Sequence, residues 1–173
     1  MHVRRSALTA LLVATLMPLF FSGCCFRYSF TDASVPEDIK TVSIDQFPNY
    51  APLATPTLSQ AFTEALRDFF LTQTNLQLVR ENGDIQLEGE ITGYSTTPVA
   101  IQGNETAAQN RLKVTVNVRF TNTKDETQNF ESPFTGQSDY SADLSLTDVE
   151  EELLDDINQQ LVQDIFNRGF SNW

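Results

Sequence analysis

The sequence predicts a two-layer α/β sandwich, with a mixed sheet of about four to five strands and two helices packed on one of its faces. Two segments repeat apolar residues at helical spacing, and several others alternate apolar with polar residues. The order strand–helix–strand at the start requires a parallel crossover, while hairpins later in the chain are antiparallel. The predicted sheet is therefore mixed.

Residues 1–23 are predicted to be a cleaved signal peptide. Two arginines precede an apolar run of about 15 residues, whereas a membrane span needs about 20. Ser22-Gly23 directly before Cys24 resembles the bacterial lipoprotein box. That resemblance implies diacylglycerol on the Cys24 thiol, cleavage before Cys24 and acylation of the new amino terminus. An ordinary signal peptide with an incidental cysteine is the alternative.

The composition excludes several function classes. The chain has 11 basic and 23 acidic residues, a net charge of −12, which becomes −14 once Arg4 and Arg5 leave with the signal peptide. Such an acidic domain is repelled by phosphate backbones, so we expect no nucleic-acid partner. The single histidine, His2, also leaves, so no Ser-His or Cys-His nucleophile and no His-based metal site can form. No cofactor is expected besides the covalent lipid on Cys24.

Residues 24–40 are interpreted as the lipidated terminus and a tether, and residues 41–173 as a single domain. A strand is predicted at Thr41–Phe47, and Thr57 with Gln60 forms a capping-box pattern that opens a helix. The apolar stripe of this helix consists of Leu58, Ala61, Phe62, Ala65, Leu66, Phe69 and Phe70.

Asn82-Gly83 predicts a β-hairpin between the segments Leu76–Arg80 and Asp84–Tyr94. One face of the second strand is expected to carry Ile85, Leu87, Gly89, Ile91 and Gly93. A polar loop is expected at Ser95–Asn110, before the next strand.

Arg111–Thr121 alternates most strictly, so one face of this strand is expected in the core and the other toward solvent or a partner. A last strand near Asn129–Thr135 contains Pro133, which favours an edge position. After a loop at Asp139–Thr147, a capping box of Thr147 and Glu150 is expected to open the second helix, and Gly169 is expected to end or loosen it.

Taken together, these segments resemble the LptE family, the lipopolysaccharide-assembly lipoproteins of the Gram-negative outer membrane, in their Bacteroidota-type branch. The resemblance covers essentially the whole mature chain. It rests on the lipoprotein box with Tyr28-Ser29-Phe30 after it, Pro56–Gln60, Gly89–Tyr94, Pro98–Ala108 and Arg119–Asp125. It implies a non-enzymatic plug and assembly partner of the LptD-type β-barrel that takes part in lipopolysaccharide delivery. It also implies a location at the cell outer membrane, lipid-anchored, on the periplasmic side or within the barrel lumen.

Two sets of residues are candidate contacts. Arg111, Lys113 and Arg119 fall on the same outward face of one strand and are predicted to meet lipopolysaccharide or acidic residues of the barrel. Cross-strand pairing with Glu88 or Glu90 is the alternative. The apolar patch that includes Pro98, Val99 and Ile101 is predicted to lie in a loop that touches the barrel, with a loop folded back on its own core as the alternative.

Two other classes of function remain to be separated from this one. The first is a free-standing lipoprotein that binds lipid or polysaccharide without a barrel. The second is a carboxylate-dependent hydrolase using Asp84, Glu88 or Glu90, but these residues lie on or beside a regular strand with no sign of a cleft. We therefore expect no enzymatic activity.

Overall fold

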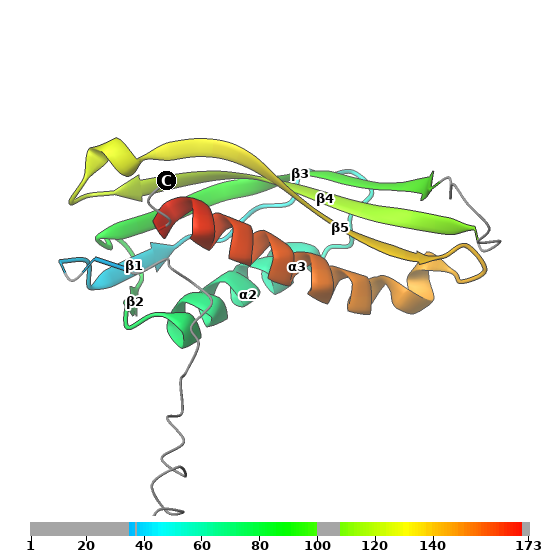
Figure 1. Ribbon diagram of the computed structural model, residues 1–173, viewed down its shortest axis with the longest axis horizontal. Coiled ribbons are helices and arrows are strands. Elements are labelled where there is room, and N and C mark those ends of the chain that lie inside the picture. Colours follow the sequence, from blue (N-terminus) through cyan, green and yellow to red (C-terminus); the bar gives the residue numbers. More distant parts are fainter. Residues whose placement is uncertain (1–34, 37, 100–107, 171–173) are drawn as a thin grey trace, which may run out of the picture. The chain divides into compact units, whose positions relative to one another are not determined.

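Within residues 35–36, 38–99 and 108–170, which the computed structural model describes, five strands form one mixed sheet with two α-helices below it (Figure 1). The strand order is β2-β1-β3-β4-β5. The predicted α/β sandwich is confirmed. The elements are β1 (Thr41–Ile44), α2 (Leu58–Gln73), β2 (Gln77–Val79), β3 (Ile85–Val99), β4 (Gln109–Asn122), the 3₁₀ turn η2 (Glu126–Gln128), β5 (Phe130–Ser141) and α3 (Leu146–Phe170).

The hairpin predicted at Asn82-Gly83 is wrong, because β1 lies between β2 and β3 and pairs with both in parallel. The short connection from β2 to β3 instead passes close against β1. A Cβ atom on Gly83 would lie 2.5 Å from the backbone nitrogen of Ser43, so only glycine fits here. Asn82, with a φ of 57°, supplies the left-handed turn. The Asn-Gly pair therefore carries the chain past a neighbouring strand.

The strands β3, β4 and β5 are longer than predicted. Ser95–Val99 continues β3 and Asp139–Ser141 continues β5, although both stretches were expected to be loop. Ser95–Thr97 are polar and exposed, so backbone pairing rather than apolar alternation holds this stretch in the sheet. In Asp139–Ser141, Tyr140 is buried in the core. The edge position predicted for the strand with Pro133 is confirmed, because β5 is the last strand of the sheet.

A β-bulge at Thr92 changes the face assignment along β3. Ile91 lies opposite Val116 and Gly93 opposite Thr115, so Thr92 is an extra residue. Gly93 therefore does not share the core face with Ile91, contrary to the prediction. Tyr94 takes that side instead and packs against the core.

Both helices are confirmed, but neither starts with the predicted capping box. Thr57 already has helical angles (φ −76°, ψ −17°) and its side chain caps no backbone N–H. α3 begins at Leu146, so Thr147 lies inside the helix rather than before it. Gly169 also lies inside α3, where a Cβ atom would come within 2.7 Å of the Phe120 ring. Glycine occurs at position 169 because it leaves room for the Phe120 ring, and not because the helix ends there.

The core between sheet and helices is apolar, and its largest group of aromatic rings lies at one end. Phe70 of α2 contacts the rings of Phe69, Phe166 and Phe170, and Phe170 also contacts Phe120 of β4. Phe120 stacks in turn on Phe130 of β5 with ring centroids 5.1 Å apart. Within the described ranges, no helix combines the length and the apolar character that crossing a bilayer requires.

Candidate binding face of the sheet

β4 places the three predicted cations on the face of the sheet opposite the helices. Its inward residues, which are buried, are Leu112, Val114, Val116, Val118 and Phe120. Arg111, Lys113 and Arg119 alternate with them and are partly or fully exposed. The strict alternation in the sequence made this shared face predictable.

Arg111 is engaged by the neighbouring strand β5. Its Nε donates to Oδ1 of Asp139 over 2.6 Å, and its Nη2 donates to Oδ2 over 2.7 Å. This two-point contact raises the pKa of Arg111 and holds the pKa of Asp139 below its usual range. A phosphate that binds Arg111 must therefore compete with a carboxylate already in place.

Arg119 is shared by carboxylates on both of its neighbouring strands. Its Nε lies 3.1 Å from Oε2 of Glu131 on β5, and its Nη1 lies 3.6 Å from Oε2 of Glu88 on β3. The hydrogen bonds from Arg119 and from Asn117 lower the pKa of Glu131. Because the Arg119 side chain is 57% exposed, these pairs add little stability. They do neutralise the cation locally.

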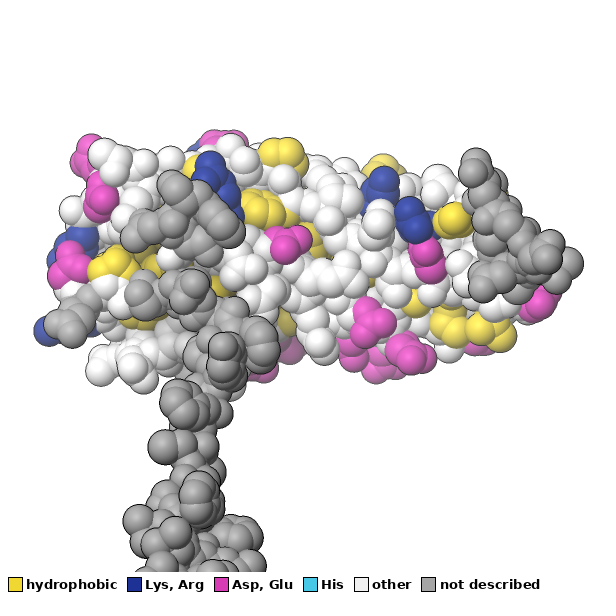
Figure 2. Space-filling view, viewed as in Figure 1, with side chains coloured by type: hydrophobic (Ala, Val, Ile, Leu, Met, Phe, Trp, Pro, Cys, Tyr) yellow, Lys and Arg dark blue, Asp and Glu magenta, His cyan; other side chains and the backbone are white. Residues whose placement is uncertain are grey.

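Lys113 differs from the two arginines. It is exposed, and its partners across the sheet are the polar residues Ser95 and Gln137. Among the residues that the structure describes, no salt bridge involves Lys113. In Figure 2, acidic side chains gather over the first half of α3, whereas Lys and Arg side chains lie singly along the upper part of the view and at its left end. The positive charge available on this face is therefore centred on Lys113.

The predicted contact patch lies only partly within the described residues. Pro98 and Val99 are the last residues of β3, opposite Asn110 and Gln109, so the prediction of a loop at these two positions is wrong. Pro98 is exposed. Ile101 and the lipid-attachment residue Cys24 lie outside the described residues.

Of the carboxylates that pair with the arginines, the sequence analysis named Glu88, as the alternative of cross-strand pairing, but not Glu131 or Asp139. Asp139 and Glu131 share the outward face of β5 with Pro133, Thr135 and Gln137. The odd-numbered alternation in β5 was a usable signal for both residues, but Asp139 was missed because the strand was expected to end at Thr135. The hydrogen bond from the Tyr94 hydroxyl to Oε1 of Glu150 on α3 was also missed, because it depends on the bulge at Thr92.

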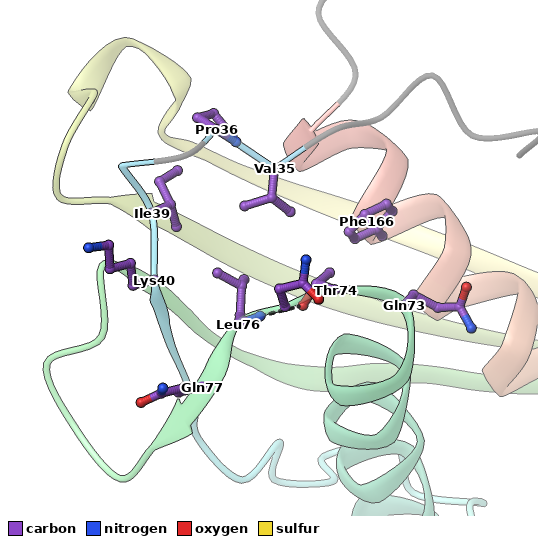
Figure 3. A pocket seen from close by; sticks show the side chains of 10 residues that line it. Val35, Pro36, Ile39, Lys40, Gln73, Thr74, Leu76, Gln77 and Phe166 are labelled. Carbon is purple, nitrogen blue, oxygen red and sulfur yellow. Dashed lines mark hydrogen bonds between the residues drawn. The ribbon is translucent and has the colours of Figure 1, made fainter.

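A hollow of about 570 Å³ lies at the other end of the fold, where the described chain begins (Figure 3). It is lined by Val35, Ile39, Leu76 and Phe166, and the backbone N–H of Leu76 donates to Oγ1 of Thr74 at its floor. Lys40 is the only ionisable residue among the ten that line it.

The described residues also include possible metal ligands. Within residues 35–36, 38–99 and 108–170, no group of three or more His, Cys, Asp and Glu residues could hold a metal ion. The outward face of the sheet offers a polar surface on which cations and carboxylates alternate.

The comparison with protein families decides the assignment. The family model LptE, lipopolysaccharide-assembly, matches residues 39–168. The chain belongs to the LptE family. The LptE match spans β1 to α3 almost completely, so the sheet with its outward cations is the family's domain. LptE proteins serve lipopolysaccharide assembly rather than catalysis.

Several solved structures resemble this LptE chain. A hypothetical protein from Chlamydia trachomatis has a TM-score of 0.53 at 9% identity, covering 78% of this chain and 99% of its own. A minor lipoprotein from Acinetobacter baumannii has a TM-score of 0.48 at 19% identity, covering 78% and 92%. Rare lipoprotein B from Shewanella oneidensis has a TM-score of 0.46 at 12% identity, covering 75% and 90%. At such identities the likeness concerns the fold alone. No curated protein sequence matches this chain.

Proposed function

We propose that this LptE-family chain is a non-enzymatic subunit of the lipopolysaccharide transport complex. Anchored in the outer membrane by lipid on Cys24, it plugs and supports an LptD-type β-barrel and contacts lipopolysaccharide through the outward face of β4. The observation that carries the proposal is the family match over residues 39–168. The polar, catalytically unequipped sheet face agrees with it.

The barrel partner is tested by affinity isolation of the native lipoprotein in mild detergent. The proposal expects a large outer-membrane β-barrel protein in stoichiometric amount, identified by mass spectrometry. A free-standing lipoprotein that binds lipid or polysaccharide would be isolated without a barrel protein, and this result would overturn the proposal.

The anchor is tested by mass spectrometry of the mature amino terminus. A diacylglycerol-modified and acylated Cys24 is expected, and Cys24→Ser should release the protein from membranes. Several acyl chains give a stable anchor, because each buried CH₂ contributes about 0.8 kcal/mol. An unmodified and freely secreted chain would contradict the proposal.

The lipopolysaccharide contact is tested by charge reversal on β4. The double variant Arg111→Glu/Lys113→Glu should bind immobilised lipopolysaccharide at least about tenfold more weakly, since it replaces two cations with carboxylates on the face that a phosphate would approach. Lys124→Gln is the matched control, because Lys124 lies beyond the strand end and pairs with Asp84. Equal binding by all three proteins would reject lipopolysaccharide contact at this face.

A further inference from the structure

The second half of β3 forms a free edge of the sheet. β1 pairs with β3 only from Ile85 to Leu87, and one further bridge joins Asn49 to Ile91. Beyond this bridge, within the described residues, β3 pairs with β4 on one side and with no strand on the other. The backbone groups on that side are therefore open to a further strand.

The bulge determines which backbone groups point to the free edge. Ile91 uses this side, since its N–H donates to the carbonyl of Pro48 and its carbonyl accepts from the N–H of Tyr50, both over 2.9 Å. Along a strand, the backbone N–H and C=O of successive residues point alternately to one neighbouring strand and to the other. The extra residue at the bulge shifts this alternation by one position. Tyr94, Thr96 and Pro98 therefore follow Ile91 on the free edge. A proline fits this series, because its missing N–H faces away from β4.

The opposite edge of the sheet, on β5, is partly blocked, in one place by a contact with α3. On β5, Pro133 removes one edge donor, and the N–H of Gln137 donates to Oε1 of Gln160 on α3 over 3.3 Å. Natural sheets commonly block their edges in such ways. Within the described residues, no hydrogen bond reaches the backbone N–H or C=O of Tyr94 or Thr96 from outside the sheet.

An acidic groove lies on the helix side of this part of the fold. The Tyr94 hydroxyl donates to Glu150, which lines a hollow of about 450 Å³ between the starts of α2 and α3. Glu151 and Asp155 also line it, Leu58 and Leu154 form its apolar part, and no Lys or Arg is among the lining residues. A strand added to β3 would direct every second side chain toward this layer.

We infer that an extended segment of the barrel partner, with Lys or Arg at alternate positions, adds to β3 as a further strand along Tyr94–Pro98. Its backbone would pair with the free edge, and its basic side chains would lie toward the carboxylates of Glu150, Glu151 and Asp155. A second copy of this chain is a poor occupant, because symmetric pairing would bring two acidic helix layers together. The inference rests on the proposed barrel partnership.

Thr96 offers a matched pair of variants. Thr96→Pro removes the edge N–H and leaves the pairing of β3 with β4 intact, whereas Thr96→Val alters only the side chain. In the native lipoprotein isolated with its barrel, Thr96→Pro should lower the co-isolated barrel about tenfold, and Thr96→Val should leave it unchanged. Glu151→Lys/Asp155→Lys should lower it as well, since the partner segment is basic.

Hydrogen exchange and cross-linking test the same edge of β3 and do not require the Thr96→Pro variant to fold. In the wild-type protein, the amides of Tyr94 and Thr96 should exchange rapidly alone and slowly in the complex. A photo-cross-linking amino acid at Thr96 should capture a barrel segment with alternate basic residues, and one at Thr135 on the opposite face should not.

The outcomes separate this inference from the function on which it rests. A barrel that co-isolates equally with wild type and Thr96→Pro, with no exchange protection at Thr96, overturns strand addition but keeps the partnership. Capture of a second copy of this chain at Thr96 overturns it too. A wild-type protein that isolates without any barrel overturns both.

Discussion

Asp84 joins three parts of the fold through one carboxylate, and its replacement should be costly. Oδ2 accepts hydrogen bonds from the N–H of Lys40 (3.0 Å), the N–H of Thr41 (3.0 Å) and Oγ1 of Thr41 (2.9 Å). Oδ1 lies 2.9 Å from Nζ of Lys124. The start of β1 is thereby held to the start of β3 and to the turn after β4.

The magnitude follows from what each partner loses in Asp84→Ala. A hydrogen bond to a charged group contributes about 1.5–3 kcal/mol, but the freed N–H groups of Lys40 and Thr41 can reach water. Lys124 is 45% exposed, so its ion pair contributes less than about 1 kcal/mol. We expect Asp84→Ala to lower the free energy of unfolding by about 2–4 kcal/mol and Lys124→Gln by less than about 1 kcal/mol.

The pH dependence supplies an independent measurement. The Lys40 N–H, followed by Lys124 and Thr41, holds the pKa of Asp84 well below its ordinary value of 3.8. Since the pKa is lower in the folded chain, this stabilisation is present above the unfolded pKa and is lost as pH falls below about 4. The stability of the wild type should therefore fall more steeply on acidification than that of Asp84→Asn.

The assay is urea unfolding of the lipid-free Cys24→Ser chain followed by circular dichroism, at neutral pH and at several values below pH 4. Other carboxylates titrate in both proteins, so the difference between wild type and Asp84→Asn isolates Asp84. An Asp84→Ala protein within about 0.5 kcal/mol of wild type, or parallel acid profiles for wild type and Asp84→Asn, would refute the reasoning.

Three further substitutions probe packing and the helix contact. Gly89→Ala would place a Cβ atom 2.1 Å from the backbone oxygen of Asn117, so a strand must shift, and calorimetry should show a loss of about 3 kcal/mol. Phe70→Ala removes a fully buried ring from the aromatic end of the core and should cost about 3–5 kcal/mol in urea unfolding. Tyr94→Phe loses the bond to Glu150 and should cost about 1 kcal/mol at neutral pH. Burial, then Glu150, raises the pKa of Tyr94, so the advantage of the wild type should vanish and then reverse as the pH rises above 10, the ordinary tyrosine value.

Periodicity predicted most of the fold, because most of its elements bury one face. The alternation in Arg111–Thr121 located β4 and its outward cations, and the stripe from Leu58 to Phe70 located α2. It failed where the chain is held by backbone contacts alone. Nothing in the side chains of Ser95–Val99 requires a strand, and the bulge at Thr92 is visible only as a register shift between two strands.

Local motifs gave wrong predictions for a related reason. A short motif predicts the backbone conformation of its own residues but not which segment lies beside them. Asn82-Gly83 does adopt a left-handed turn, as a hairpin pair would, yet β1 occupies the place of the expected partner strand. Gly169 is a common helix terminator, but here it gives room to a phenylalanine ring from β4. At both positions a residue larger than glycine would not fit, because a segment distant in sequence packs closely against the backbone.

The core is unevenly distributed, and this separates stability from binding. The aromatic cluster around Phe70, Phe120 and Phe170 lies where α2 and the end of α3 meet the sheet, whereas the distal part of β3, β4 and β5 lies over the first part of α3 (Figure 1). Lys113 and the free edge at Thr96 both belong to that distal part. The proposed partner surface leaves backbone groups and charges unsatisfied, and the large buried rings at the other end supply the stability that allows this.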